Sequence, residues 1–239
     1  MPGLSHPLGT LEHIVVRCGQ LVLRLRKQAM VARNNDDQRG AHFSTSADRE
    51  SFTLGVKILR DNFPDEAVIA EEQANDGRVP PDCIVFDPLD GTTNYFNGSD
   101  DFGVTVCMLR SGMPIRGATY FPVRRLLISA EYYGGCWIGG FRQGTRLRAI
   151  PWHDRLDRAQ IGTDIGSWTN THDLFDPVLK PLSRTFTVLS AMAAVEGARR
   201  VLLGQTAAYY NLGVAKVWDA AAMSLAITEA GGVACAPSG

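Results

Sequence analysis

Two aspartates and a glycine follow directly after an apolar run in this sequence. The run Cys83-Ile84-Val85-Phe86 leads into Asp87-Pro88-Leu89-Asp90-Gly91-Thr92-Thr93-Asn94. Such a run predicts a buried strand, and open α/β sheets bind ligands at the carboxyl ends of their strands. Two ionised carboxylates about 4 Å apart repel by roughly 4 kcal/mol at an effective dielectric near 20. A hard divalent cation removes this repulsion and prefers oxygen ligands, so the pattern predicts a metal site at Asp87 and Asp90.

A turn without chemistry is the alternative for these residues, because Asp-Pro and Asp-Gly are common turn formers. Two further acidic segments favour the metal site. Glu71-Glu72 follow the short apolar run 67–70, and Asp219 stands at or near the N-cap of a helix expected to end at Gly231-Gly232. Taken alone, Asp219 is well explained as a helix cap. In combination, the three segments predict one carboxylate cage.

Together these segments resemble the signature motifs of the inositol monophosphatase family. The motifs are Glu71-Glu72, the stretch 87–94 and Trp218-Asp219 with Glu-Ala-Gly-Gly at 229–232, and Thr45-Ser46-Ala47-Asp48 resembles the family's Thr-x-x-Asp element. They occur in the family's order and span almost the whole chain. The resemblance implies Mg²⁺-dependent, lithium-sensitive hydrolysis of phosphate monoesters. The family's relatives include fructose-bisphosphatases, histidinol-phosphatases and phosphoadenosine-phosphate phosphatases, so the resemblance leaves the substrate open.

The resemblance also implies a set of metal ligands. Glu71, Asp87 and the backbone carbonyl of Leu89 would hold one Mg²⁺. Asp87, Asp90 and Asp219 would hold a second, with Asp87 bridging the two ions and Asp90 also contacting the substrate. Paired ions of this kind stabilise the attacking and leaving oxygens of an in-line displacement. A third, weakly held ion would bind differently or not at all, because the loop before residue 45 lacks the family's usual lysine.

Catalytic and substrate-binding roles follow from the same resemblance. Asp48 and Thr92 would activate the attacking water, with Glu71 assisting, and no phosphoenzyme is implied. Gly91 and Thr92 would offer backbone N–H groups to the phosphate at the start of a short helix. Inositol-specific members carry a glutamate where this chain has Asn211. Asparagine both donates and accepts hydrogen bonds, so Asn211 is expected to hold substrate hydroxyls.

Substrate and activity therefore have several candidates. Inositol-1-phosphate is the leading substrate, and histidinol phosphate or a sugar phosphate is the alternative on the same machinery. A nucleotide-phosphate or sulfate-ester enzyme is a third possibility. A sensor of phosphorylated metabolites that has lost turnover belongs to a different class. Tyr210, Lys216 and the pair Arg199-Arg200 could contribute to specificity, although arginines on a helix are more often solvated.

Composition agrees with a metabolic enzyme. The chain has 239 residues, 45% of them hydrophobic, and its 24 basic and 25 acidic residues leave a net charge of -1. This balance argues against nucleic acid as a partner. The five cysteines show no CxxC spacing and are expected to be reduced and buried in a cytoplasmic protein. We expect no signal peptide and no membrane span, and family habit suggests a homodimer.

The sequence predicts an α/β fold. Apolar residues at helical spacing mark helices over 11–25 and 52–63, short β runs fill 102–150, and α/β alternation returns after 161 with helices near 176–182 and 191–203. The polar stretch 31–42 is expected to be a loop. The family resemblance implies a five-layer αβαβα sandwich of two lobes, 1–150 and 151–239, with the metal cage between them. Family members continue with another strand, helix and strand after the Glu-Ala-Gly-Gly turn, so the C-terminal layer is expected to be shortened.

Overall fold

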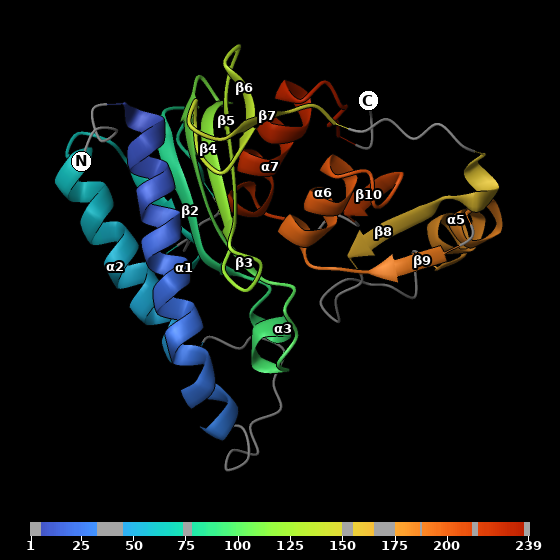
Figure 1. The fold of residues 1–239 in the computed structure, drawn as a ribbon, viewed down its shortest axis with the longest axis horizontal. Coiled ribbons are helices and arrows are strands. Elements are labelled where there is room, and N and C mark those ends of the chain that lie inside the picture. The colour runs from blue at the N-terminus through green and yellow to red at the C-terminus, as the bar shows by residue number, and fades with distance from the viewer. Residues whose placement is uncertain are drawn as a thin grey trace.

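Figure 1 shows the fold of a computed structural model, which describes residues 6–32, 45–73, 78–149, 155–164, 175–186, 188–211 and 215–236. Seven strands form one mixed sheet in the order β1-β2-β3-β4-β5-β6-β7. Strands β1 and β2 are parallel, and every later neighbour is antiparallel. The strands are β1 Val68–Ala70, β2 Cys83–Asp90, β3 Gly103–Arg110, β4 Met113–Phe121, β5 Leu126–Glu131, β6 Gly135–Ile138 and β7 Thr145–Leu147.

Two long helices, α1 Pro7–Ala32 and α2 Ser46–Asn62, cover one face of this sheet (Figure 1). Their apolar stripes explain the packing, because each helix turns one face toward the sheet. The fully buried residues of α1 include Leu11, Ile14 and Val15. Both helices predicted from periodicity are therefore confirmed. Helix α1 extends beyond the predicted range at both ends, and α2 begins earlier than predicted and ends one residue before Phe63.

The opposite face of the sheet carries α6 Ala194–Leu202 and α7 Val217–Glu229. Helix α7 buries residues on most of its sides, as expected of a helix enclosed within the protein. It approaches β4 closely at Gly117, where an added Cβ would lie 2.9 Å from the Cα of Ala222. This close approach fixes the position of α7, and with it the residues at the start of that helix.

A second, three-stranded parallel sheet lies beyond α6 and α7, in the order β10-β8-β9 (Figure 1). Helix α5 lies on its far side, which completes the predicted order of five layers, αβαβα. The elements are β8 Gln160–Asp164, β9 Val188–Ala191, β10 Ala208–Asn211, the π-helical turn η4 Phe175–Leu179, α5 Lys180–Thr185, and the short helix η3 Leu156–Arg158. Strands β1–β7 precede residue 150 and β8–β10 follow it, and the division into two lobes at that residue stays a prediction.

Several details differ from the sequence-based expectations. The predicted helix at 191–203 begins only at Ala194, and the one at 176–182 is a π-helical turn that continues into α5. Four cysteines are buried as predicted, but Cys235 is exposed because it lies beyond the end of α7. Most of the loop expected at 31–42 lies outside the described residues. Among the described helices, none combines the length and apolar character that a membrane crossing needs.

Candidate functional site

Strand β2 delivers Asp87 and Asp90 to the same side of the sheet. In a regular strand, residues three apart point to opposite faces. Here Asp87 pairs with Thr105 and Asp90 with Gly103, so three steps on β2 match two steps on β3. This register shift is a β-bulge, which turns Asp90 to the face that Asp87 already occupies. Both aspartates are buried, with exposed fractions of 1% and 8%.

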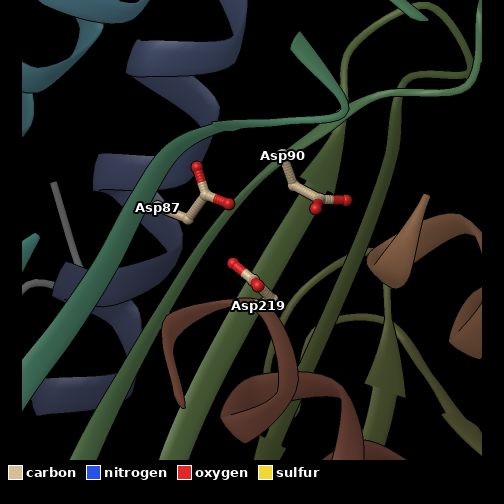
Figure 2. A group of neighbouring side chains, drawn as sticks. All are labelled: Asp87, Asp90 and Asp219. Atoms are coloured by element: carbon tan, nitrogen blue, oxygen red, sulfur yellow. The ribbon is translucent and has the colours of Figure 1, made fainter. Parts of the chain in front are cut away.

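Asp219 approaches these two aspartates from α7, which begins at Val217. The N-cap is Lys216, so Asp219 occupies the third helical position, where its Oδ2 accepts the backbone N–H of Lys216 over 2.7 Å. The helix cap and the carboxylate cage therefore use the same side chain. Carboxylate oxygens of Asp87, Asp90 and Asp219 lie within 4.8 Å of one another (Figure 2).

Backbone groups hold two of these carboxylates in place. Oδ1 of Asp87 accepts the N–H of Leu89 over 2.9 Å, and Oδ2 of Asp90 accepts the N–H of Val195 over 3.0 Å. The second bond reaches Asp90 from α6, so β2, α6 and α7 all contribute to one cluster. Only part of each carboxylate is used by these bonds, which leaves acceptor capacity directed into the cluster.

The cluster carries a high electrostatic cost. Burial, followed by repulsion from Glu71, Asp90 and Asp219, raises the pKa of Asp87 well above its ordinary value. Burial and repulsion from Asp219 do the same for the pKa of Asp90. Burial raises the pKa of Asp219 to about 6. Three convergent carboxylates that are hard to ionise together are the donor set that a hard divalent cation such as Mg²⁺ fits.

Glu71 borders this cluster from the short 3-10 helix η2 Glu71–Gln73, which follows β1. The residue as a whole is exposed, but its carboxyl group is buried. This burial and repulsion from Asp219 and Asp48 raise the pKa of Glu71 to about 7, although a hydrogen bond with Asp87 lowers it in part. The predicted ligand Glu71 thus lies next to Asp87, outside the tight group of three aspartates. Its role as a ligand stays a prediction.

Asp48 and Thr92 are in direct contact, although 44 positions separate them in the sequence. The hydroxyl of Thr92 donates to Oδ1 of Asp48 over 2.8 Å and lies 3.0 Å from the carbonyl oxygen of Leu89. The other oxygen of Asp48 accepts both the backbone N–H and the hydroxyl of Thr45, the N-cap residue of α2. Burial raises the pKa of Asp48 despite these bonds. The N-terminus of α2 therefore holds Asp48 beside the carbonyl that was predicted to bind a metal.

Gly91 occupies a position that no other residue fits well. Its φ of 83° lies in the left-handed region, and it caps the short helix α3 Thr92–Phe96. A Cβ at this position would lie 2.9 Å from the carbonyl oxygen of Asp101 and 3.3 Å from the Cβ of Ala193. The glycine therefore permits both the turn and the close packing of two loops beside the cluster. Its predicted contact with phosphate stays a prediction.

Asn211, predicted to hold substrate hydroxyls, makes hydrogen bonds within the protein. Its Oδ1 accepts the N–H of Ala215 over 3.0 Å, and its Nδ2 donates to the hydroxyl of Tyr209 over 3.4 Å. These bonds occupy much of the capacity of the amide. The following residues of the family's Glu-x-Gly segment lie outside the described residues, and the substrate role of Asn211 stays a prediction.

Asp164 and Val195 belong to this neighbourhood and were missed in the sequence. Asp164 ends β8, its pKa is raised by burial, and it contributes in turn to the raised pKa values of Asp90 and Asp219. An acid after the short run 161–163 has the same pattern as Asp87 after its strand, so a signal was available. Val195 acts through its backbone, for which the sequence carries no signal.

Arg199 is buried and Arg200 is partly buried, and both pair with an acid of the same helix. Glu196 is fully buried, and its carboxylate accepts from Arg199 at 2.8 and 2.7 Å and from Nε of Arg200 at 2.8 Å. Arg124 lies 3.6 Å from the same carboxylate. Arg199 is therefore not solvated, because a buried acid at i-3 pairs with it, whereas Arg200, which pairs with the same acid at i-4, keeps a side chain that is 28% exposed. A contribution of the two arginines to specificity stays a prediction.

Comparison with known proteins finds similarity to one family over most of the chain. The inositol monophosphatase family model matches residues 8–239. The Nus factor SuhB of Pseudomonas aeruginosa is 28% identical over 90% of this chain and 79% of its own length. An inositol monophosphatase of Dictyostelium discoideum is 28% identical over 77% of this chain and 68% of its own.

Solved structures confirm the fold. The extragenic suppressor protein suhB of Bartonella henselae superposes with a TM-score of 0.79 at 22% identity, covering 93% of this chain and 84% of that one. At this identity the likeness concerns the arrangement of layers and not the chemistry. The family assignment rests on the family model, the order of the acidic motifs and the cluster that they form. This chain belongs to the inositol monophosphatase family.

Proposed function

We propose that the protein hydrolyses a small phosphate monoester with the help of Mg²⁺, with inositol-1-phosphate as the leading substrate. The observation that carries this proposal is the convergence of Asp87, Asp90 and Asp219 within 4.8 Å. Three carboxylates from two separate segments, with raised pKa values, are costly unless a cation balances them. A purely structural role would give no reason to gather them.

The residues that would hold Mg²⁺ are those that the family resemblance names. Asp87, Asp90 and Asp219 form the cluster, Glu71 lies next to Asp87, and Leu89 directly precedes Asp90 in β2. When bound, Mg²⁺ supplies positive charge that stabilises a transferring phosphoryl group. The proposal is that two Mg²⁺ ions bind, with a third ion as the alternative.

The remaining chemistry belongs to Asp48 and Thr92. Asp48 accepts the hydrogen bond that the Thr92 hydroxyl donates. The lone pairs of the Thr92 oxygen are therefore available to accept a hydrogen bond from a water. Burial raises the pKa of Asp48, which makes its carboxylate a stronger base than an exposed aspartate. The pair can thus orient the attacking water and draw charge from it, without forming a covalent bond to phosphorus.

A binding role without turnover is the second candidate. It is favoured by the relative from Pseudomonas aeruginosa, which is named a Nus factor and not a phosphatase. The intact Asp48–Thr92 contact favours hydrolysis, because a protein that only binds phosphate has no use for a base beside the acidic cluster. Histidinol phosphate and sugar phosphates remain the alternative substrates for the same site.

A phosphate-release screen tests the proposal. Polyol, sugar, amino-alcohol and nucleotide monoesters are compared with and without Mg²⁺, and with EDTA as the metal-free control. We expect Mg²⁺-stimulated release that is fastest with inositol-1-phosphate. Phosphate release from histidinol phosphate alone would overturn inositol-1-phosphate as the leading substrate. Phosphate binding without any release would favour a binding role without turnover. Homodimerisation and cytoplasmic location are further predictions, the first of which sedimentation can check.

A further inference from the structure

Asp164 is the last residue of β8 in the three-stranded sheet. The parallel pairing of β8 and β10 places Asp164 directly opposite Asn211. Paired residues of parallel strands project to the same face, so both side chains share one face of the sheet. Tyr209, two residues before Asn211, also belongs to this face, and its ring packs against Gly197 of α6. The shared face is therefore the one that α6 covers.

The position of Asp164 brings its charge near the cluster. Its carboxylate contributes to the raised pKa values of Asp90 and Asp219, and to that of Tyr209. Asp90 and Asp219 come from β2 and α7, so Asp164 approaches these acids from a third element. Helix α6 contacts both sides, because its Val195 donates to Asp90 and its Gly197 packs against Tyr209. A group bound at the cluster and extending toward the second sheet would meet Asp164 and Asn211.

Asp164 and Asn211, on the shared face of the second sheet, differ in the hydrogen bonds that they can still accept. The oxygen of Asn211 accepts from Ala215, and its amide donates to Tyr209. Within the described part of the chain, no hydrogen bond or ion pair involves the Asp164 carboxylate. An ionised carboxylate accepts at both oxygens, so Asp164 offers a larger unused acceptor capacity than Asn211.

We propose that Asp164 determines specificity by accepting hydrogen bonds from donor groups on the alcohol portion of the substrate. The inference rests on the proposed function, since it assumes that a phosphate ester binds with its phosphate at the acidic cluster. The donors that suit a carboxylate are hydroxyl groups of a polyol or the ammonium group of an amino alcohol.

The test compares esters with and without such donors. Wild type, Asp164→Ala and Asp164→Asn are assayed with inositol-1-phosphate, phosphoethanolamine and phenyl phosphate, whose alcohol portion has no donor. Asp164→Ala removes hydrogen bonds between the substrate and a charged group. It should therefore lower kcat/KM for a donor-bearing ester by about tenfold or more, mainly by raising KM. The change for phenyl phosphate should be much smaller, so the ratio of kcat/KM between donor-bearing and donor-free esters is the quantity that tests the proposal.

The asparagine variant separates the two kinds of donor. Asparagine keeps a carbonyl acceptor but loses the charge. If hydroxyl groups are bound, Asp164→Asn should recover much of the activity on inositol-1-phosphate. If an ammonium group is bound, Asp164→Asn should be as poor as Asp164→Ala on phosphoethanolamine. Asp176→Asn, an exposed acid in η4 of the same half of the protein, is the matched control and should behave as wild type.

Equal losses on all three esters, or no loss on any, would overturn the proposal, as would a wild type without preference for donor-bearing esters. Thermal unfolding of each variant shows whether a general loss comes from misfolding. If wild type releases no phosphate at all, the proposed function has failed, and the variants are then compared by ligand-observed NMR of free inositol. Weaker inositol binding by Asp164→Ala would still support the inference, and unchanged binding would refute it.

Discussion

The backbone N–H of Val195 donates a hydrogen bond of 3.0 Å to Oδ2 of Asp90, across 105 positions of the sequence. Val195 lies in the first turn of α6, where N–H groups have no partner within the helix. Asp90 satisfies one of these groups, and the helix in turn fixes the direction of the carboxylate. One bond therefore links the strand that carries two acids of the cluster to the helix that separates the two sheets.

Replacing Asp90 by asparagine should abolish turnover and preserve the fold. The introduced amide oxygen can still accept from Val195, but the substitution removes one charge from the proposed second ion site. We expect kcat/KM to fall by at least about 100-fold, since even partners of metal ligands are worth up to that much. In the absence of Mg²⁺, thermal stability should be equal or higher, because repulsion with Asp219 is relieved. Phosphate release and thermal unfolding measure the two effects.

The control for this change is Asp61→Asn, because Asp61 is exposed on α2 and pairs only with Lys57 at the surface among the described contacts. It should leave activity and stability close to wild type. Activity of Asp90→Asn near the wild-type rate would remove Asp90 from the proposed metal site.

Replacing Thr92 by valine should separate catalysis from metal binding. Valine has nearly the same shape but cannot donate to Asp48 or bind water. We expect kcat to fall by about 10²- to 10⁴-fold, as for loss of a positioned acid or base. The Mg²⁺ concentration at half-maximal thermal stabilisation should stay close to wild type.

Thr92→Ser restores the hydroxyl and should recover most of the activity. The matched control is Thr93→Val, an exposed neighbour on the same short helix. Wild-type kcat in Thr92→Val would show that the Asp48–Thr92 contact is only a structural brace.

The stabilisation of the protein by Mg²⁺ should increase with pH. Burial and repulsion from neighbouring carboxylates raise the pKa values of Glu71 and Asp219 to about 7 and about 6. The folded, metal-free protein therefore binds more protons than the unfolded chain between about pH 4 and pH 7, and loses stability as pH rises through this window. Mg²⁺ competes with these protons, so the increase in Tm on adding Mg²⁺ should be larger at about pH 8 than at about pH 5.

Thermal unfolding in EDTA and in Mg²⁺ across this range measures the effect, with Ca²⁺ as a second hard cation. An increase in Tm that is independent of pH would mean that the cation does not bind at the acidic cluster.

Glu196 should stabilise the protein at neutral pH and lose this effect in acid. Burial raises its pKa, but hydrogen bonds from Arg199 and Arg200 outweigh burial and lower the pKa below its ordinary value. The contribution is therefore complete above the ordinary pKa and disappears as pH falls through the lowered one. Glu196→Gln leaves Arg199 buried without a charged partner, so it should cost about 3–5 kcal/mol of unfolding free energy at neutral pH.

Urea unfolding at neutral and acidic pH checks this prediction, and the difference between Glu196→Gln and wild type should shrink in acid. The double variant Glu196→Leu, Arg199→Leu is the control, because it removes the buried acid together with its buried partner, while Arg124 and Arg200 keep their contacts with Asp101. A cost that is equal at both pH values would show that packing, and not charge, explains the role of Glu196.

Much of the fold and the main acidic residues could be read from the sequence. Periodicity located α1 and α2, and the apolar run before Asp87 located β2. The sequence also suggested that a short helix begins after Thr92, one residue later than it does, and that α7 ends near Gly231, because caps and glycines act over a few residues. The position of Asp219 was approximate, since a cap residue and the third residue of a helix have similar preferences.

The sequence by itself determined which residues carry chemistry here: the acids that end apolar runs, the glycine that follows them and the threonine beside it. The tertiary structure decided which of these side chains meet. A bulge in β2 turns Asp90 to the side of Asp87, Val195 reaches it from α6, and strand register sets Asp164 opposite Asn211. Such relations depend on the packing of distant segments, and no local pattern of residue types encodes them.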